Sequence, residues 1–296
     1  NLRYFDHHYN NGENRKLFTE EFVKRFGPPR VKEAEIEQRH ADIAFALQKL
    51  TENIILKLTR DAKLKTGKKN LCLAGGVVLN CLANQKIIES GIFKNIFIQP
   101  ASNDAGTSIG ASLYTHYLLN QHSRRFVMDN MYLGPEYNNN DILSYLERND
   151  RKKEFNYTFL ENPTVVAAKL IADDYVIGWF QGRMEFGPRA LGNRSILASP
   201  KDKNMKDKVN NKIKFREKFR PFAPSVLEEY SKIVFNLSEP GKLVYPFMLA
   251  TSEVKSSWNE KIPAILHEDG TARVQVVSKE INPLYWKLIN EFHKIS

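Results

Sequence analysis

The sequence predicts a mixed α/β fold, because short apolar runs alternate with stretches in which apolar residues recur at helical spacing. Between residues 70 and 119 this pattern gives a strand, a helix, a second strand and a second helix. The chain has 296 residues, which fits two domains of roughly 100–200 residues each. A polar, basic stretch at 120–131 is the candidate linker, so we expect one domain at 1–125 and another at 126–296.

In the first part of the chain, the spacing of apolar residues predicts the helices and strands, and glycines mark where they end. Apolar side chains at helical spacing predict one long helix that ends at Thr66-Gly67. A short apolar run that ends in Gly75-Gly76 is typical of a buried strand. The elements expected here are helices at 19–26, 36–65, 77–89 and 105–119, and strands at 70–74 and 95–100.

The second part alternates basic loops with short elements. Pro163 suits the first position of a helix, where its missing N–H costs nothing. The sequence predicts helices at 141–148, 163–173 and 204–212, a strand at 175–180, and further short strands beyond.

Composition narrows the classes of partner. The apolar fraction is 42%, the charged fraction is 26% and the net charge is +10, which excludes a disordered polyanion and favours anionic partners. No run approaches the roughly 18 consecutive apolar residues of a membrane-spanning helix. The chain starts without Met and without a signal-peptide pattern, so we interpret it as a piece of a larger cytoplasmic protein with no membrane partner.

The first chemical motif is the turn after the first predicted strand, at residues 74–80 (AGGVVLN). Gly75 and Gly76 lack a Cβ and let a ligand approach the backbone, and the next helix would offer free N–H groups to a phosphate. Asn80 is placed to bond a ribose or a phosphate. The alternative is a tight turn that binds nothing.

The second motif places Asp104 between a predicted strand and a predicted helix. Its carboxylate is either the N-cap of that helix or a metal ligand.

The third motif, residues 182–195, follows a predicted strand and carries three arginines among glycines. Glycine loops expose backbone donors, and guanidinium groups bind phosphate or carboxylate with two parallel hydrogen bonds. Glu185 is a candidate for orienting one of the arginines. The alternative is a surface loop with solvated charges.

Two further motifs are basic. The stretch 201–220 is rich in Lys and Arg and permits a solvated helix face, a nucleic-acid surface, or an anion site in which Lys214 and Arg220 converge. Beyond a turn at Asp269-Gly270, Arg273 and Gln275 alternate along a predicted strand and so share one face. His267 is either a base or a turn residue.

Taken together, these motifs resemble the O-carbamoyltransferases of the nodulation-protein-U family. The resemblance rests on the order and spacing of several blocks and covers nearly the whole chain. The blocks are 39–44, 74–80, 99–106, 132–135, 182–195, 219–225 and 267–273.

The resemblance implies a fold and a reaction. Residues 1–125 would be the second half of an actin-like (ASKHA) domain, and 126–296 a YrdC-like α/β domain that is cut short at its C-terminus. The YrdC-like domain would form carbamoyladenylate from carbamoyl phosphate and ATP. The actin-like domain would then pass the carbamoyl group to a hydroxyl of a sugar, glycan or natural product.

The resemblance also implies roles for single residues. Gly75, Gly76, Asn80 and Arg183 would hold the nucleotide, and Asp104 would bind a divalent metal, Fe²⁺ in the first place and Mg²⁺ as the alternative. The residues implied for carbamoyl phosphate are Lys214, Arg220, Arg273, Arg189 and Arg194. The rival hypothesis is a tRNA- or dsRNA-binding module, based on the net charge and the basic run.

Overall fold

The computed structural model describes residues 4, 18–32, 34–120, 126–148, 154–215, 217 and 219–296. Residues 1–57 and 58–296 form two compact units. Helices and strands alternate along the chain, which confirms the predicted mixed α/β class. The predicted division into domains at 1–125 and 126–296 stays a prediction.

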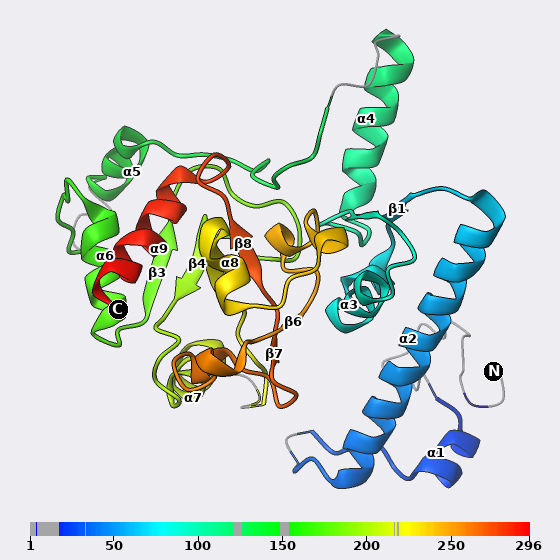
Figure 1. Cartoon of the computed structure of the whole chain (residues 1–296). Coiled ribbons are helices and arrows are strands. Elements are labelled where there is room, and N and C mark those ends of the chain that lie inside the picture. Colours follow the sequence, from blue (N-terminus) through cyan, green and yellow to red (C-terminus); the bar gives the residue numbers. More distant parts are fainter. Residues whose placement is uncertain are drawn as a thin grey trace. The chain divides into compact units, whose positions relative to one another are not determined.

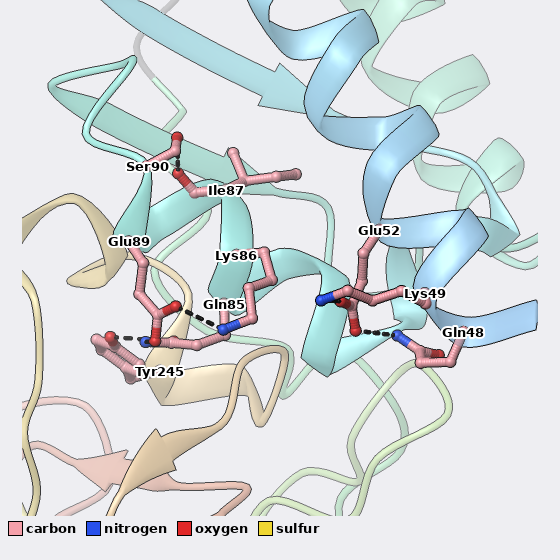
Figure 2. Close-up of polar contacts among 9 residues, drawn as sticks. All are labelled: Gln48, Lys49, Glu52, Gln85, Lys86, Ile87, Glu89, Ser90 and Tyr245. Carbon is pink, nitrogen blue, oxygen red and sulfur yellow. Dashed lines mark hydrogen bonds and ion pairs between the residues drawn. The ribbon is translucent and has the colours of Figure 1, made fainter. Parts of the chain in front are cut away.

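The first unit holds α1 (Glu20–Phe26) and most of α2 (Gln38–Thr66), which continues into the second unit (Figure 1). Thr19 caps α1, because its hydroxyl accepts a bond of 3.3 Å from the Phe22 N–H. On α2, the buried Glu52 carboxylate accepts a 2.9 Å bond from Gln48 and lies 3.7 Å from the Lys49 ammonium (Figure 2).

The second unit begins with the predicted strand–helix–strand. Strand β1 (Asn70–Leu73) pairs in parallel with β2 (Asn95–Ile98), and α3 (Cys81–Glu89) connects them. Because the strands are parallel, the segments after Leu73 and Ile98 leave the same edge. A 2.8 Å bond from the Gly75 N–H to the Ser102 carbonyl ties those two segments together.

One predicted helix, at 77–89, is divided in the structure. Gly76–Leu79 form a 3-10 turn, and α3 starts only at Cys81. The cause is Asn80, whose side-chain oxygen accepts a 3.1 Å bond from the Ala83 N–H and so caps α3.

Helix α3 is fastened to the C-terminal part of the same unit. The fully buried Asn84 donates to the Val78 and Leu249 carbonyls at 2.8 and 2.7 Å. Tyr245 lies beside Gln85 with a hydroxyl-to-amide distance of 3.5 Å, and Lys86 pairs with Glu89 (Figure 2).

The rest of this unit contains short strands in pairs, covered by helices (Figure 1). Strand β3 pairs antiparallel with β4, β5 pairs in parallel with β8, and β6 pairs antiparallel with β7. The remaining bounds are α4 (Gly106–Asn120), α5 (Asn139–Leu146), α6 (Pro163–Ala172), β3 (Ile177–Phe180), β4 (Arg194–Leu197), α7 (Met205–Val209), β5 (Ser225–Leu227), α8 (Glu228–Val234), β6 (Ser252–Glu253), β7 (Thr271–Ala272), β8 (Gln275–Val277) and α9 (Pro283–Ile295).

Buried apolar side chains hold the helices against the strands on either side of the β3–β4 loop, which is described in the next subsection. Helices α6 and α9 lie side by side and bury Ala167, Ile171 and Leu288 against β3 and β4 (Figure 1). A second cluster joins Met205 and Val209 of α7 to Ala264. Burying an Ile, Leu, Val or Met side chain contributes roughly 1.5–3 kcal/mol, and burying an Ala contributes less.

Two predicted elements differ in detail from the structure. The helix expected at 204–212 is α7 followed by a π turn, Asn210–Lys214, which ends at Phe215 with φ 47°. The strand expected across Arg273 is interrupted, because β7 ends at Ala272 and β8 begins at Gln275. Arg216 and Lys218 of the basic run lie outside the described residues. No helix in the described ranges is long and apolar enough to cross a membrane.

Candidate functional site

The glycine–arginine loop between β3 and β4 is organised by one buried carboxylate. Glu185 Oε1 accepts hydrogen bonds from the N–H groups of Leu191, Asn193 and Arg194 at 2.6, 2.9 and 3.2 Å. The sequence predicts that Glu185 orients an arginine side chain, but its hydrogen bonds in the described ranges come from backbone N–H groups and close the loop. This closed loop sets the direction of Arg189.

Two of the three arginines in this loop each donate at least two hydrogen bonds to backbone carbonyls. Arg194 donates to the carbonyls of Gln181, Asn193 and Gly182 at 2.6–3.1 Å, and its guanidinium lies 3.5 Å above the Phe180 ring. Arg183 donates to the Gly134 and Leu133 carbonyls at 3.1 and 3.3 Å. Both side chains therefore hold the loop in shape, and neither lines the cavity described next.

Arg189 belongs to a cavity of about 470 Å³ that also gathers other predicted residues. Four cationic side chains line it, each from a different segment, and no Asp or Glu occurs among its described lining residues. Positive charges held this close together in a partly apolar cavity favour an anionic ligand. We call this cavity the cationic pocket; the four cations are Arg189, Lys206, Lys214 and Arg273.

Arg220, which was expected to converge with Lys214, lies elsewhere. Its guanidinium pairs with Glu217 at 2.8 Å and its side chain is 54% exposed. The Arg220 carbonyl accepts a 3.0 Å bond from the buried Asn210. The structure thus brings Lys214 and Arg273 to the cationic pocket but leaves the Arg220 side chain outside its lining.

The predicted nucleotide turn touches the same loop. Gly75 has φ +104°, which favours glycine, and a Cβ added to Gly76 would meet no atom within 4 Å. The Arg189 guanidinium reaches the Leu79 carbonyl at 3.4 Å. The Asn80 oxygen caps α3, so one of the groups predicted to bind a ligand already has a structural partner.

Asp104 is exposed and lies two residues before Gly106, the first residue of α4. Its carbonyl accepts bonds from the Thr107 N–H and hydroxyl at 3.1 and 2.6 Å, whereas its carboxylate has no hydrogen bond within the described part of the chain. No group of three or more His, Cys, Asp or Glu that could hold a metal occurs among the described residues. One carboxylate does not make a metal site by itself.

His267 is close enough to Arg273 and Lys206 of the cationic pocket to be affected by their charges, and its hydrogen bonds fix its tautomer. Thr271 Oγ1 donates to Asp269 at 2.7 Å, so it accepts from His267 Nδ1 at 3.0 Å. His267 Nε2 is buried and has no hydrogen-bond partner in the described ranges. Burial lowers the pKa of His267 below 6.5, and the nearby charges of Arg273 and Lys206 act in the same direction, against Asp269.

This depressed pKa gives a testable pH dependence. The unfolded chain binds a proton at His267 more readily, so the free energy of unfolding should fall as the pH drops below 6.5. The slope stays below about 1.4 kcal/mol per pH unit, and solvent screening of the partly exposed ring reduces it further. Urea denaturation at several pH values should show the slope in wild type and a smaller one in His267→Gln. Equal slopes would contradict the assignment.

The sequence predicts no site role for three residues of the cationic pocket. Ser225, Gln275 and Tyr285 form a hydrogen-bonded series along its wall. The alternation of Arg273 and Gln275 was a signal for Gln275, but Tyr285 lies on α9 and carries no local signal. Lys206 was visible only as one member of the basic run.

A second cavity of about 450 Å³ shares Gln275 with the cationic pocket. Its lining has the opposite charge balance, with five acidic side chains and two lysines. The two cavities therefore differ in charge balance, so the excess of cations in the first does not follow from the +10 charge of the chain alone. The charged residues of this second lining are Asp129, Glu228, Glu229, Glu239, Glu280, Lys232 and Lys242.

Comparison with known proteins finds a family match in each of the two halves of the chain. Residues 2–113 match the family model for the carbamoyltransferase N-terminus, and residues 168–296 match that for the carbamoyltransferase C-terminus. The chain is 42% identical to nodulation protein NolO of Bradyrhizobium diazoefficiens over 92% of its own length and 48% of that protein. It is 35% identical to nodulation protein U of Rhizobium tropici over 78% of its length and 37% of that protein.

A protein of Synechocystis is 40% identical over 95% of this chain and 49% of its own length, so the chain spans about half the length, or less, of these curated relatives. These matches confirm the resemblance to the nodulation-protein-U family and do not favour the nucleic-acid-binding alternative. The chain belongs to the carbamoyltransferase family.

Proposed function

We propose that this chain is part of an ATP-dependent O-carbamoyltransferase and that the cationic pocket binds carbamoyl phosphate. The observation that carries the proposal is the gathering of Arg189, Lys214 and Arg273 in one cavity without an acidic side chain among its described lining residues. All three were implied for carbamoyl phosphate by the family resemblance. Lys206 joins them as a fourth cation.

The pocket suits the first reaction. Carbamoyl phosphate and ATP are both polyanions, and bringing them together costs Coulomb repulsion that fixed cations offset. Water first releases inorganic phosphate from carbamoyl phosphate and leaves carbamate. An oxygen of this carbamate then bonds to the α-phosphorus of ATP while pyrophosphate leaves, which requires positioning and neutralised charge more than a protein nucleophile. Fork-shaped guanidinium groups and a lysine supply both.

The other assignments extend the same proposal. A nucleotide would bind against the backbone at Gly75 and Gly76, where no neighbouring atom lies within 4 Å of an added Cβ. The exposed Asp104 carboxylate would be one ligand of a divalent metal, Fe²⁺ or Mg²⁺. In the second reaction the carbamoyl group would pass to a hydroxyl of a sugar, glycan or natural product. The ASKHA and YrdC-like folds and a cytoplasmic location belong to this proposal as well.

Pyrophosphate release from ATP, with and without carbamoyl phosphate, tests the proposal. We expect carbamoyl-phosphate-dependent release from the complete reading frame that encodes this chain. Release from residues 1–296 alone would place the adenylation step within them. A complete protein that releases no pyrophosphate but retains tRNA, with an affinity that falls steeply with salt, would overturn the proposal.

A further inference from the structure

The four cations of the cationic pocket can bind the phosphate of carbamoyl phosphate, but its uncharged carbamoyl end needs a hydrogen-bond acceptor. Arg and Lys side chains donate hydrogen bonds and accept none, so the four cations can hold a phosphate but cannot bind an amide N–H. A carbamoyl group carries an NH₂ with two donors. If those donors enter the pocket without an acceptor, each loses its hydrogen bonds to water without replacement, and binding is weakened.

Gln275 is the only residue with a side-chain carbonyl among the described lining residues. The residue is buried, with 3% of its surface exposed. Its Nε2 donates to the Leu191 carbonyl at 2.8 Å, and its Oε1 accepts from the Ser225 hydroxyl at 2.7 Å. These two bonds fix which end of the amide is the oxygen.

A hydrogen bond from Tyr285 orients the Ser225 hydroxyl. Tyr285 donates to Ser225 Oγ at 2.9 Å, so the Ser225 proton points toward Gln275. Burial raises the pKa of Tyr285 to about 12, which keeps its hydroxyl protonated and donating. The series Tyr285, Ser225, Gln275 thus runs in one donor direction and ends at an amide oxygen.

That oxygen has capacity left for a ligand. An amide carbonyl accepts two hydrogen bonds, and one of these comes from Ser225. The hydroxyls of Ser195 and Ser199 also line the pocket and each accepts one N–H, from Gly192 and Lys201, but no second bond within the described ranges fixes their orientation, whereas the Gln275 amide is held at both ends. Gln275 is therefore the preorganised acceptor of this cavity.

We propose that Gln275 is a specificity-determining residue whose Oε1 accepts an N–H of the carbamoyl group, and that the pocket thereby selects carbamoyl phosphate over acyl phosphates of the same shape. This inference rests on the proposed function. Acetyl phosphate is the matched probe, because a methyl group replaces the NH₂. A pocket built to bond an N–H rejects the analogue that lacks it.

The test is calorimetric titration of the purified chain with carbamoyl phosphate, acetyl phosphate and inorganic phosphate. Wild type should prefer carbamoyl over acetyl phosphate by about 10-fold or more, because one lost hydrogen bond costs roughly that much. Gln275→Met should bring the two affinities within about 2-fold, because it removes the acceptor. Its affinity for inorganic phosphate should stay within about 3-fold of wild type, because the cations remain.

Ser225→Ala is the second variant, because it leaves the acceptor present but no longer oriented by Ser225. We expect a preference between those of wild type and Gln275→Met. A full preference retained in a folded Gln275→Met protein, or in both variants, would overturn this inference alone. Wild type that binds inorganic phosphate but discriminates against neither acyl phosphate would also overturn it. Wild type that binds no phosphate compound would instead remove the proposed function.

Discussion

Replacing Glu185 with alanine is expected to lower the free energy of unfolding by roughly 3–5 kcal/mol. The substitution leaves the N–H groups of Leu191, Asn193 and Arg194 without their shared acceptor in a buried loop. A buried donor without a partner costs about 1–3 kcal/mol, and bonds to a charged acceptor are stronger than neutral ones. The removed carboxylate no longer has to be desolvated, which offsets part of the loss.

Guanidinium denaturation of the wild type and of two variants measures this effect. Glu185→Gln is the matched control, because its amide oxygen still accepts N–H bonds while the charge is lost; we expect a loss of about 1–2 kcal/mol. The alanine variant should also bind inorganic phosphate more weakly, because the loop that carries Arg189 is no longer closed. An alanine variant within about 1 kcal/mol of wild type would show that the loop is held by other contacts.

Much of the fold was predictable because its signals are local. The periodic apolar residues of α2, the apolar runs of β1 and β2, and the glycines between them each dictate conformation over a few residues. The errors are local as well. The Asn80 side chain accepts a backbone N–H and starts a new helix. The spacing of apolar residues does not show this helix start.

The candidate site was predictable in residue type but not in geometry. Arg183, Arg189 and Arg194 look equivalent in the sequence, yet Arg183 and Arg194 each donate at least two hydrogen bonds to backbone carbonyls, whereas Arg189 donates one within the described part of the chain and lines the cationic pocket. Which arginine is left for a ligand depends on where the chain returns, for example at Gly134 and Gln181. The Tyr285–Ser225–Gln275 series joins α9, β5 and β8, and such long-range pairing has no local pattern.

Arg273 is expected to give the largest catalytic effect. Arg273→Ala should lower kcat/KM for carbamoyl phosphate in the complete protein by about 10²–10³-fold, as removal of one preorganised donor to a reacting oxygen does elsewhere. Lys214→Ala should cost less, about 10-fold, because the Lys214 side chain is exposed and its charge is better screened by water. Arg273→Lys should fall between wild type and alanine, because it keeps the charge but loses the planar fork.

A control variant separates this local role from the loss of positive charge as such. Arg60→Ala removes an exposed guanidinium on α2, outside the lining of the cationic pocket, and should change kcat/KM by less than about 2-fold. Thermal denaturation of each variant shows whether it is folded. If Arg273→Ala and Arg60→Ala had equal effects, the +10 charge would act through a diffuse field, which a steep dependence on salt would reveal. A loss that is confined to Arg273 and Lys214 and persists at high salt requires direct binding of the anion in the pocket.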